Sequence, residues 1–295
     1  SPIDELVTIR DWLRYAVTSM NRAGLVYGHG TTNAVDEASY LILATLDLPI
    51  DDINPWLDCR LTLAERENVD AVISKRIETR KPAAYITNAA YIQGHKFYVD
   101  ERVIVPRSFI GELLAEDQLG TIVPDPLAVR RVLDLCTGSG CLAILAALAF
   151  PNAEVDASDI SEDALSVAKR NIGDYGLEHR VRTFKADLFD GLPPTTYDLI
   201  ISNPPYVTAE AVAAFPPEYQ AEPALAHLGG VDGMDLVRRI LDGAPRWLSP
   251  TGSLVVEIGM GQEALEASRP DLPFLWLDSE TSQGEVFALQ ADDLK

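Results

Sequence analysis

Basic residues are scarce in this sequence. The chain has 24 lysines and arginines against 45 aspartates and glutamates, which gives a formal net charge of −21 at pH 7. A protein that holds a nucleic-acid phosphate backbone needs a concentrated basic surface, so no direct DNA binding is expected. A basic protein partner would instead be attracted. The acidity alternatively serves solubility alone, and composition leaves these two interpretations open.

Cysteines, histidines and long apolar runs are also few or missing. The three cysteines, Cys59, Cys136 and Cys141, have no Cys-x-x-Cys spacing, so reduced thiols are expected. The four histidines are scattered without metal-ligand spacing, and no metal site is predicted. No apolar run reaches 18 residues, and no basic-then-apolar leader opens the chain. These absences predict a cytoplasmic protein that does not enter a membrane.

The pattern of apolar residues changes along the chain and divides it into three parts. Residues 1–83 have helical periodicity and predict helices over 3–21, 35–46 and 63–80, with Asn33 and Thr62 as caps. Residues 84–105 alternate and predict a hairpin over 85–105 that turns near Gln93 and Gly94. From residue 106 to 295, strands and helices follow one another, which is typical of a doubly wound α/β domain.

Within this third part, short apolar runs predict buried strands. They cover 131–136, 153–158, 181–184, 197–202, 254–257, 274–277 and 286–289, and helical patterns cover 141–150, 162–174 and 235–248. Residues 208–232 are rich in proline and glycine and too long for a plain connection, so they predict a loop that covers the substrate.

A glycine loop follows the first of these strands. The string Thr137-Gly138-Ser139-Gly140 leads directly into the helix that begins at Cys141. Its glycines would let the backbone pass close beneath a ligand, and the first helical N–H groups would point at that ligand. Extended to Ala143, the string also satisfies the dinucleotide pattern G-x-G-x-x-A, so a nicotinamide enzyme stays open. A bare packing turn is the simpler alternative.

Acidic residues stand at or near the ends of successive strands. Asp134 precedes the glycine loop, where it is a poor neighbour for a pyrophosphate but a good one for an ammonium or sulfonium group. Asp159 follows the next strand and suits both ribose hydroxyls of an adenosine, whichever cofactor carries it. Asp187 follows the third strand and is positioned to accept the adenine amino group. The set favours S-adenosylmethionine over a dinucleotide.

The string Asn203-Pro204-Pro205-Tyr206 lies at the tip of the strand over 197–202. Two prolines remove two backbone donors, so the carbonyl oxygens of Asn203 and Pro204 stay outside any strand pairing. With the Asn203 side-chain oxygen, they form a group of acceptors suited to a planar NH₂ group, and Tyr206 offers a ring to stack on it. The alternative is a simple turn.

These residues, in this order, resemble the class I S-adenosylmethionine-dependent methyltransferases that alkylate amide or exocyclic nitrogens. Within them, the chain looks like the protein-(glutamine) methyltransferase family. Further strings support the resemblance: Pro106-Arg107, Glu222-Pro223-Ala224-Leu225, Gly229-Gly230-Val231-Asp232-Gly233-Met234-Asp235 and Glu257-Ile258-Gly259.

Two branches of that family modify different proteins. The release-factor branch typically carries Pro-Arg-Pro-Glu-Thr-Glu where this chain has Pro106-Arg107-Ser108-Phe109-Ile110-Gly111. The branch that modifies a large-subunit ribosomal protein (L-three) is similar at three other strings: Tyr85-Ile86-Thr87-Asn88, the segment 94–103 and the segment 23–31. We therefore favour the ribosomal-protein branch and keep the release-factor activity as the alternative.

The resemblance implies an α/β fold with a Rossmann-like doubly wound sheet, an antiparallel last strand and a small helical domain for substrate recognition. It implies S-adenosyl-L-methionine as cofactor, a basic ribosomal protein as partner and direct methyl transfer to a glutamine amide nitrogen. The implied catalytic residues are Asn203, Pro204, Pro205 and Tyr206. The implied cofactor-binding residues are Asp134, Cys136, Thr137, Gly138, Gly140, Asp159, Ile160, Asp187, Leu188 and Asn203. More distant alternatives are a nicotinamide-dependent dehydrogenase and a non-catalytic ribosome-assembly binder.

Overall fold

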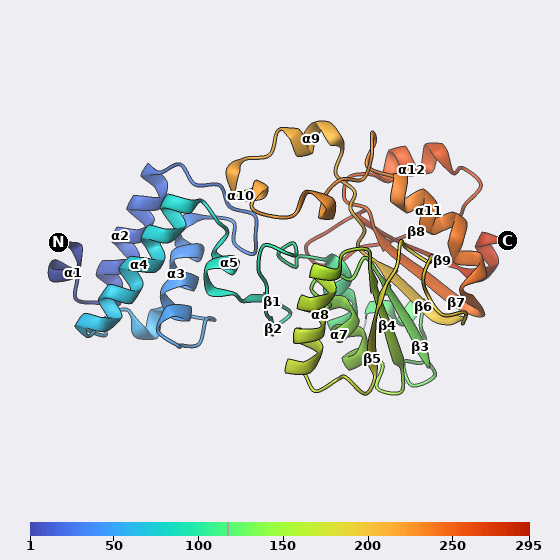
Figure 1. Cartoon of the computed structure of the whole chain (residues 1–295), viewed down its shortest axis with the longest axis horizontal. Helices are drawn as coiled ribbons and strands as arrows, with labels where there is room; N and C mark the ends of the chain where they lie inside the picture. The colour runs from blue at the N-terminus through green and yellow to red at the C-terminus, as the bar shows by residue number, and fades with distance from the viewer. Residues whose placement is uncertain (117) are drawn as a thin grey trace.

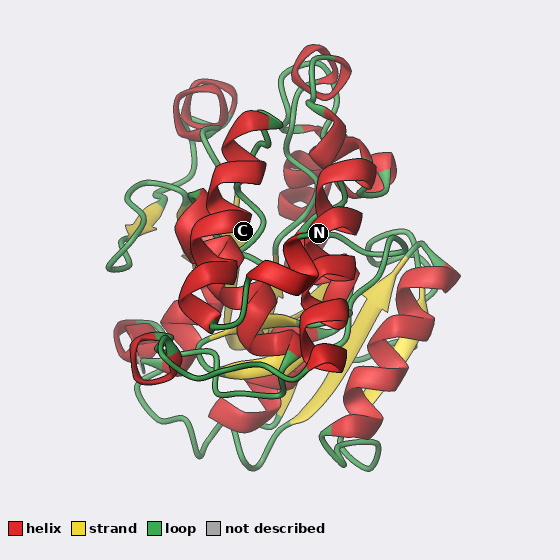
Figure 2. Ribbon diagram, turned by 90° about the vertical axis from the view of Figure 1, so that its left-hand side faces the viewer, coloured by secondary structure: helices red, strands yellow, loops and turns green. Residues whose placement is uncertain are grey.

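The computed structural model describes residues 1–116 and 118–295, which form a helical amino-terminal part beside a larger α/β part (Figure 1). The two termini lie at opposite ends of the long axis in that view. Figure 2 turns the amino-terminal helices toward the viewer and places the sheet behind them. The amino-terminal elements are α1 (Pro2–Glu5), α2 (Ile9–Arg22), α3 (Ala34–Thr45), η1 (Asn54–Trp56), α4 (Leu63–Thr79) and α5 (Ala83–Thr87).

Helices α3 and α4 begin where their caps predict. The Asn33 side chain accepts from Asp36 N at 2.9 Å, and the Thr62 hydroxyl accepts from Glu65 N at 3.3 Å. The single helix expected over 3–21 is wrong. Thr8 starts a new helix by accepting from Asp11 N, and the Asp11 carboxylate in turn accepts from Thr8 N at 2.9 Å.

The hairpin between the two parts is shorter than predicted. It consists of β1 (Ala90–Ile92) and β2 (His95–Phe97), which pair antiparallel. Its turn lies at Gln93 and Gly94, as expected, and both have the positive φ that a tight two-residue hairpin turn requires. The strand expected from residue 85 is wrong because residues 83–87 form α5, which ends at Asn88 in the left-handed conformation.

A seven-stranded sheet forms the α/β part. Its strands are β3 (Arg131–Leu135), β4 (Glu154–Asp159), β5 (Val181–Lys185), β6 (Tyr197–Ser202), β7 (Leu248–Glu257), β8 (Leu275–Leu277) and β9 (Val286–Gln290). Their order is β5-β4-β3-β6-β7-β9-β8, and β9 pairs antiparallel with both of its neighbours. The predicted doubly wound sheet with an antiparallel last strand is confirmed.

Successive residues of a strand point to opposite faces of the sheet, and β3, β6 and β7 carry buried apolar residues on both faces. Helices therefore cover both faces of the sheet. Val132 packs with α6 (Phe109–Ala115) and α7 (Cys141–Ala149) in one core. Leu133 packs in the other core with α11 (Asp235–Gly243) and α12 (Gln262–Ser268). Helix α8 (Glu162–Asp174) lies beside α7 (Figure 1). Among the described residues, no helix has both the length and the apolar character of a membrane span.

Two boundaries of the α/β part differ from the prediction. The helix expected over 235–248 ends at Gly243, because the following turn η4 (Ala244–Arg246) contains Pro245, which cannot continue an α-helix. Strand β7 therefore starts at Leu248, six residues before the predicted start at 254. Helices α6 and α12 lie where no helix was predicted.

The segment 208–232, which we call the strap, contains α9 (Ala209–Ala213), α10 (Pro217–Gln220) and η3 (Ala224–Ala226). It reaches from the sheet to the amino-terminal helices (Figure 1). Glu218 anchors it there, since its side chain accepts from Val26 N at 3.0 Å and forms an ion pair with Arg80 at 2.8 Å. The strap is thus fixed to both parts of the chain.

Candidate active site

The loop after β3 takes a backbone shape that depends on its glycines. Cys136, Gly138 and Gly140 all have positive φ, and Gly140 caps the start of α7. A Cβ on Gly140 would lie 3.0 Å from the Ala168 Cβ, so the glycine also allows α8 to approach. The loop therefore leaves the strand tip tightly turned, with Cys136 and Gly138 facing a cavity.

Asp134, on β3, holds this loop through a hydrogen bond. Its carboxylate accepts a hydrogen bond from the Thr137 hydroxyl at 2.6 Å, and the residue is 1% exposed. Burial raises the pKa of Asp134 to about 7. Asp134, Thr137 and Gly140 are absent from the cavity wall, and Asp134 Oδ1 has no hydrogen-bond partner among the described residues. Asp134 thus contacts the loop instead of the cavity.

A cavity of about 420 Å³ lies at the carboxyl ends of β3, β4, β5 and β6, within the range of ~300–1,000 Å³ usual for small-molecule sites. Among the predicted site residues, those in its wall are Cys136, Gly138, Asp159, Ile160, Asp187, Leu188, Asn203 and Pro205. Val103 and Ile104 close it on another side and belong to residues 98–107 after the hairpin, which we call the inter-domain segment. Leu228 from the strap closes it on a further side. Residues from four strand tips therefore meet at one hollow.

Two acidic side chains in the cavity wall already interact with other residues of the protein. Asp159 accepts from Gly138 N and from Ser161 N, both at 2.9 Å, and burial raises its pKa. Asp187 forms an ion pair with Arg239 of α11 at 3.0 Å, with both side chains about half exposed. Arg239 lines the cavity and was missed by sequence reasoning, because nothing near Asp187 in the chain points to α11.

Asn203 follows β6 and stands between two hollows. It lines the cavity, and it also lines a neighbouring cleft together with Pro204, Tyr206 and Tyr219. Its side-chain oxygen is buried and accepts no hydrogen bond from any described residue. A buried acceptor of this kind costs about 1–3 kcal/mol when it stays unpaired, so the site is suited to a donor group that arrives with a ligand.

Tight packing fixes the Asn-Pro-Pro-Tyr string. A Cβ on Gly233 would lie 2.2 Å from the Tyr206 carbonyl oxygen, and one on Gly259 would lie 2.6 Å from the Tyr206 ring. Neither position tolerates a side chain without a shift of Tyr206. The glycines of the strings around Gly233 and Gly259 therefore allow the backbone and the strand end to close around Tyr206.

A buried carboxylate, Glu222 of the strap, organises the outer wall of the cleft. It accepts from Val105 N at 2.9 Å and from two nitrogens of Arg107 at 2.8 and 3.0 Å. Nε2 of His227 lies 2.8 Å from its Oε2, and Nε2 of His29 lies 3.5 Å away. Burial by itself would raise the pKa of Glu222, but the nearby imidazoles of His227 and His29 and the hydrogen-bonded Arg107 guanidinium hold it far below its ordinary value.

The Glu222 cluster joins the strap to the segment that carries Val105 and Arg107. The strap in turn pairs with the chain after Tyr206, because Val207 N donates to the His227 carbonyl at 2.8 Å. In the sequence, Glu222 stands out only as part of the string Glu222-Pro223-Ala224-Leu225. No local signal reveals that its partners Val105 and Arg107 lie more than 100 positions away.

Glu257 at the end of β7 connects the sheet to α6. Its carboxyl accepts from the Ser108 hydroxyl at 2.5 Å and from Phe109 N at 2.9 Å. Ser108 belongs to the string in which this chain differs from the release-factor branch. Burial raises the pKa of Glu257 to about 7, so the folded protein retains a proton there that the unfolded chain releases near pH 4.5.

Replacing Glu257 with glutamine is expected to stabilise the protein increasingly, relative to wild type, as pH rises from about 4.5 to 7. Wild type loses stability in this window because the folded state binds more protons than the unfolded state. The difference should grow by roughly 2–3 kcal/mol and then stay constant. Urea unfolding between pH 5 and 8 measures it, with the exposed Glu263→Gln as control. A pH-independent difference would contradict the prediction.

Comparisons with known proteins agree with this architecture. The family described as Methyltransferase small domain matches residues 117–216. Among solved structures, the catalytic domain of hMettl16 in complex with a MAT2A 3'UTR hairpin has 16% identity and a TM-score of 0.50. The match covers 80% of this chain and 84% of that one. At such low identity, it indicates the fold alone.

Curated relatives are much more similar. The ribosomal protein uL3 glutamine methyltransferase of Bradyrhizobium diazoefficiens is 55% identical over 98% of this chain and 92% of its own length. The protein of the same name from Bordetella pertussis is 53% identical over 98% of this chain and 97% of its own length. These matches rule in favour of a methyltransferase over the dehydrogenase and non-catalytic alternatives. The chain belongs to the family of ribosomal protein uL3 glutamine methyltransferases.

Proposed function

We propose that this protein transfers a methyl group from S-adenosylmethionine to the side-chain amide nitrogen of a glutamine in ribosomal protein uL3, in the cytoplasm. Asn203 carries the proposal, because its buried Oδ1 has no hydrogen-bond partner among the described residues and because it lies in the wall shared by the cavity and the neighbouring cleft. A methyl donor on one side and an amide on the other would meet at this residue. The names of the relatives support the same substrate.

The cavity suits the cofactor. Asp159 keeps further acceptor capacity on its carboxylate for the ribose hydroxyls, and Leu188 and Asp187 border the space for the adenine ring. Cys136 and Gly138 would face the amino-acid end. When bound, the cofactor supplies an electrophilic methyl group on a positively charged sulfur.

Asp134 acts through the loop in this proposal. Its bond to the Thr137 hydroxyl would hold the glycine loop in place beneath the cofactor. A cation in the cavity would in turn favour the charged form of the Asp134 carboxyl, whose pKa is raised by burial to about 7.

The amide would be held by Asn203 and Pro204. A glutamine nitrogen is a poor nucleophile because its lone pair is delocalised into the carbonyl group. The Asn203 side-chain oxygen and the Pro204 carbonyl would accept its two N–H groups, and these bonds strengthen as positive charge builds on nitrogen. Pro205 and Tyr206 would orient the amide plane, and Tyr206 itself is fixed by Gly233 and Gly259. The methylated nitrogen then becomes acidic enough to lose its proton to these acceptors or to water.

Methyl transfer to purified proteins tests the function. The enzyme would be incubated with isotope-labelled cofactor and purified uL3, and the labelled residue would be identified by mass spectrometry of its peptides. A peptide chain release factor serves as the second substrate. Label on a uL3 glutamine supports the proposal, whereas label on the release factor alone would transfer the assignment to the other branch.

Asp159→Ala is expected to weaken cofactor binding by ~1–3 kcal/mol, because the ribose loses a charged acceptor. Calorimetric titration with S-adenosylmethionine measures the affinity, and thermal melting checks the fold, since Asp159 also holds Gly138 N and Ser161 N. Asp163→Ala removes an exposed carboxylate nearby on α8 and is the control. Equal affinity of the Asp159 variant and wild type would refute the ribose contact.

A further inference from the structure

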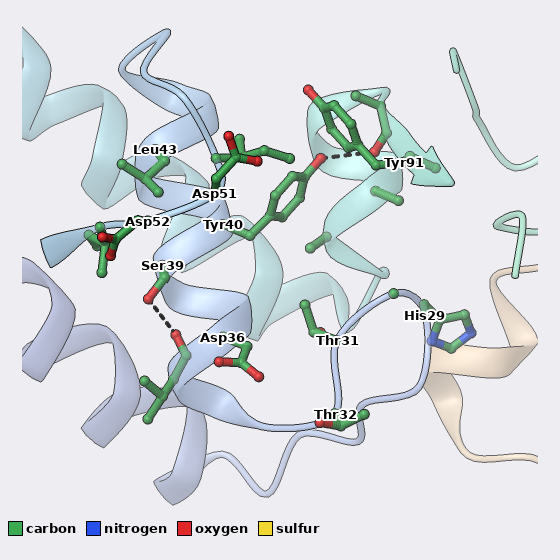
Figure 3. A pocket seen from close by; sticks show the side chains of 18 of the residues that line it. His29, Thr31, Thr32, Asp36, Ser39, Tyr40, Leu43, Asp51, Asp52 and Tyr91 are labelled. Atoms are coloured by element: carbon green, nitrogen blue, oxygen red, sulfur yellow. Dashed lines mark hydrogen bonds between the residues drawn. The ribbon is translucent and has the colours of Figure 1, made fainter. Parts of the chain in front are cut away.

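A groove of about 670 Å³ lies in the amino-terminal part, away from the cofactor cavity. We call it the amino-terminal groove. Figure 3 shows Asp36 at the first turn of α3, Tyr40 further along the same helix, and Asp51 and Asp52 on the loop that follows it. His29 lies at the other end, beside α10 of the strap. None of the described residues that line this groove belongs to the proposed catalytic or cofactor-binding set.

Carboxylates give the groove a negative charge. Asp36, Asp51 and Asp52 are exposed, and among the described lining residues there is no lysine or arginine. Two of these carboxylates accept hydrogen bonds from neutral groups: Asp36 from Asn33 Nδ2 at 2.7 Å and Asp52 from Asn54 N at 2.9 Å. Their negative charge therefore remains available to a cationic partner.

The remaining wall is largely apolar. Val35 is 51% exposed although it lines the groove, and the rings of Tyr40 and Tyr91 meet edge to face with centroids 6.2 Å apart. A hydrophobic side chain and two aromatic rings at an open groove can bury the apolar parts of an extended segment, including the stems of lysine and arginine.

The groove reaches the wall of the catalytic cleft. Val105 and Pro106 line the groove, and their neighbours Ile104 and Arg107 line the cleft that contains Asn203. On the strap side, the ring centroids of His29 and Tyr219 are 4.2 Å apart, and Tyr219 lines the cleft. A polypeptide whose glutamine enters the cleft would thus pass close to the groove.

We propose that the amino-terminal groove binds a basic segment of the protein substrate, separate from the glutamine that is methylated. Aspartates at positions 36, 51 and 52 attract lysine and arginine side chains, while Val35, Tyr40 and Tyr91 hold apolar parts of the same segment. This inference rests on the proposed function, because it assigns a second contact for the same substrate. The net charge of −21 adds long-range attraction for a basic protein.

The test neutralises the three aspartates without changing their shape. The triple variant Asp36→Asn, Asp51→Asn, Asp52→Asn keeps the side-chain oxygens that accept the local hydrogen bonds. The control, Glu67→Gln, Asp70→Asn, Glu78→Gln, removes the same charge from α4, outside the groove. Initial rates of methyl transfer to purified uL3 are measured at low and high salt, and cofactor affinity is measured by calorimetry.

The groove variant is expected to raise KM for uL3 about tenfold at low salt, with kcat and cofactor affinity close to wild type. The difference should shrink at high salt, because exposed charges are screened. The control should retain the wild-type KM. Equal KM values for groove variant, control and wild type would overturn the docking role. Absence of transfer by wild type itself would instead refute the proposed function.

Discussion

Replacing Asn203 with alanine is expected to lower turnover by ~10²–10³ while changing cofactor affinity much less. The Asn203 side-chain oxygen is buried and has no hydrogen-bond partner in the described part of the chain, so it is available to a donor that arrives with the substrate. In the proposed mechanism its contribution grows as charge develops on the amide nitrogen. Single-turnover methyl transfer to uL3 measures the rate, and calorimetry measures cofactor binding.

Thermal melting separates this effect from a loss of stability. A turn residue that only shapes the backbone would lower the melting temperature and leave the rate of the folded fraction unchanged. Asn152→Ala, on the loop before β4 at the opposite edge of the sheet, is the matched control. An Asn203→Ala enzyme that transfers methyl groups at the wild-type rate would contradict the proposed mechanism.

Glu222→Ala is expected to destabilise the protein by about 3–5 kcal/mol, the usual cost of leaving a buried charge without its partner. The substitution removes the acceptor of Val105 N and of two Arg107 nitrogens, and it also removes the anion beside His227. Because these groups join the strap to the inter-domain segment, methyl transfer should fall as well. Urea unfolding at pH 7 gives the stability.

A double-mutant cycle with Arg107→Ala identifies the cause. The double variant should lose less stability than the sum of the two single variants, because the unpaired guanidinium is no longer present. Strict additivity, or a loss of less than about 1 kcal/mol in the single Glu222 variant, would mean that the cluster behaves like an exposed ion pair.

The cofactor side of the candidate site followed from local patterns. Apolar runs long enough to be buried on both faces predict parallel strands, and the carboxyl ends of parallel strands meet at the same edge of a sheet. Cys136, Asp159, Asp187 and Asn203 each stand at or near the end of such a run, and all four line the same cavity. Their convergence was therefore predictable, although the contact of Asp187 with Arg239 was not.

Some errors had a readable local signal. Thr8 and Asp11 have the spacing of a capping box, which begins α2 and contradicts one continuous helix from residue 3. Pro245 likewise indicates the end of α11. The apolar alternation from residue 85 was misleading, because helix and strand patterns cannot be separated over five residues such as those of α5.

The sequence by itself determined the doubly wound sheet, the glycine loop and the position of the Asn-Pro-Pro-Tyr string, because each depends on residues that are neighbours in the chain. The three-dimensional fold was needed for the strap anchored by Glu218, the Glu222 cluster and the amino-terminal groove. Glu218 meets Val26 across 192 positions, and Glu222 meets Arg107 across 115. With 45 acidic and 24 basic residues, local patterns cannot say which will pair, since the packing of whole elements brings the partners together.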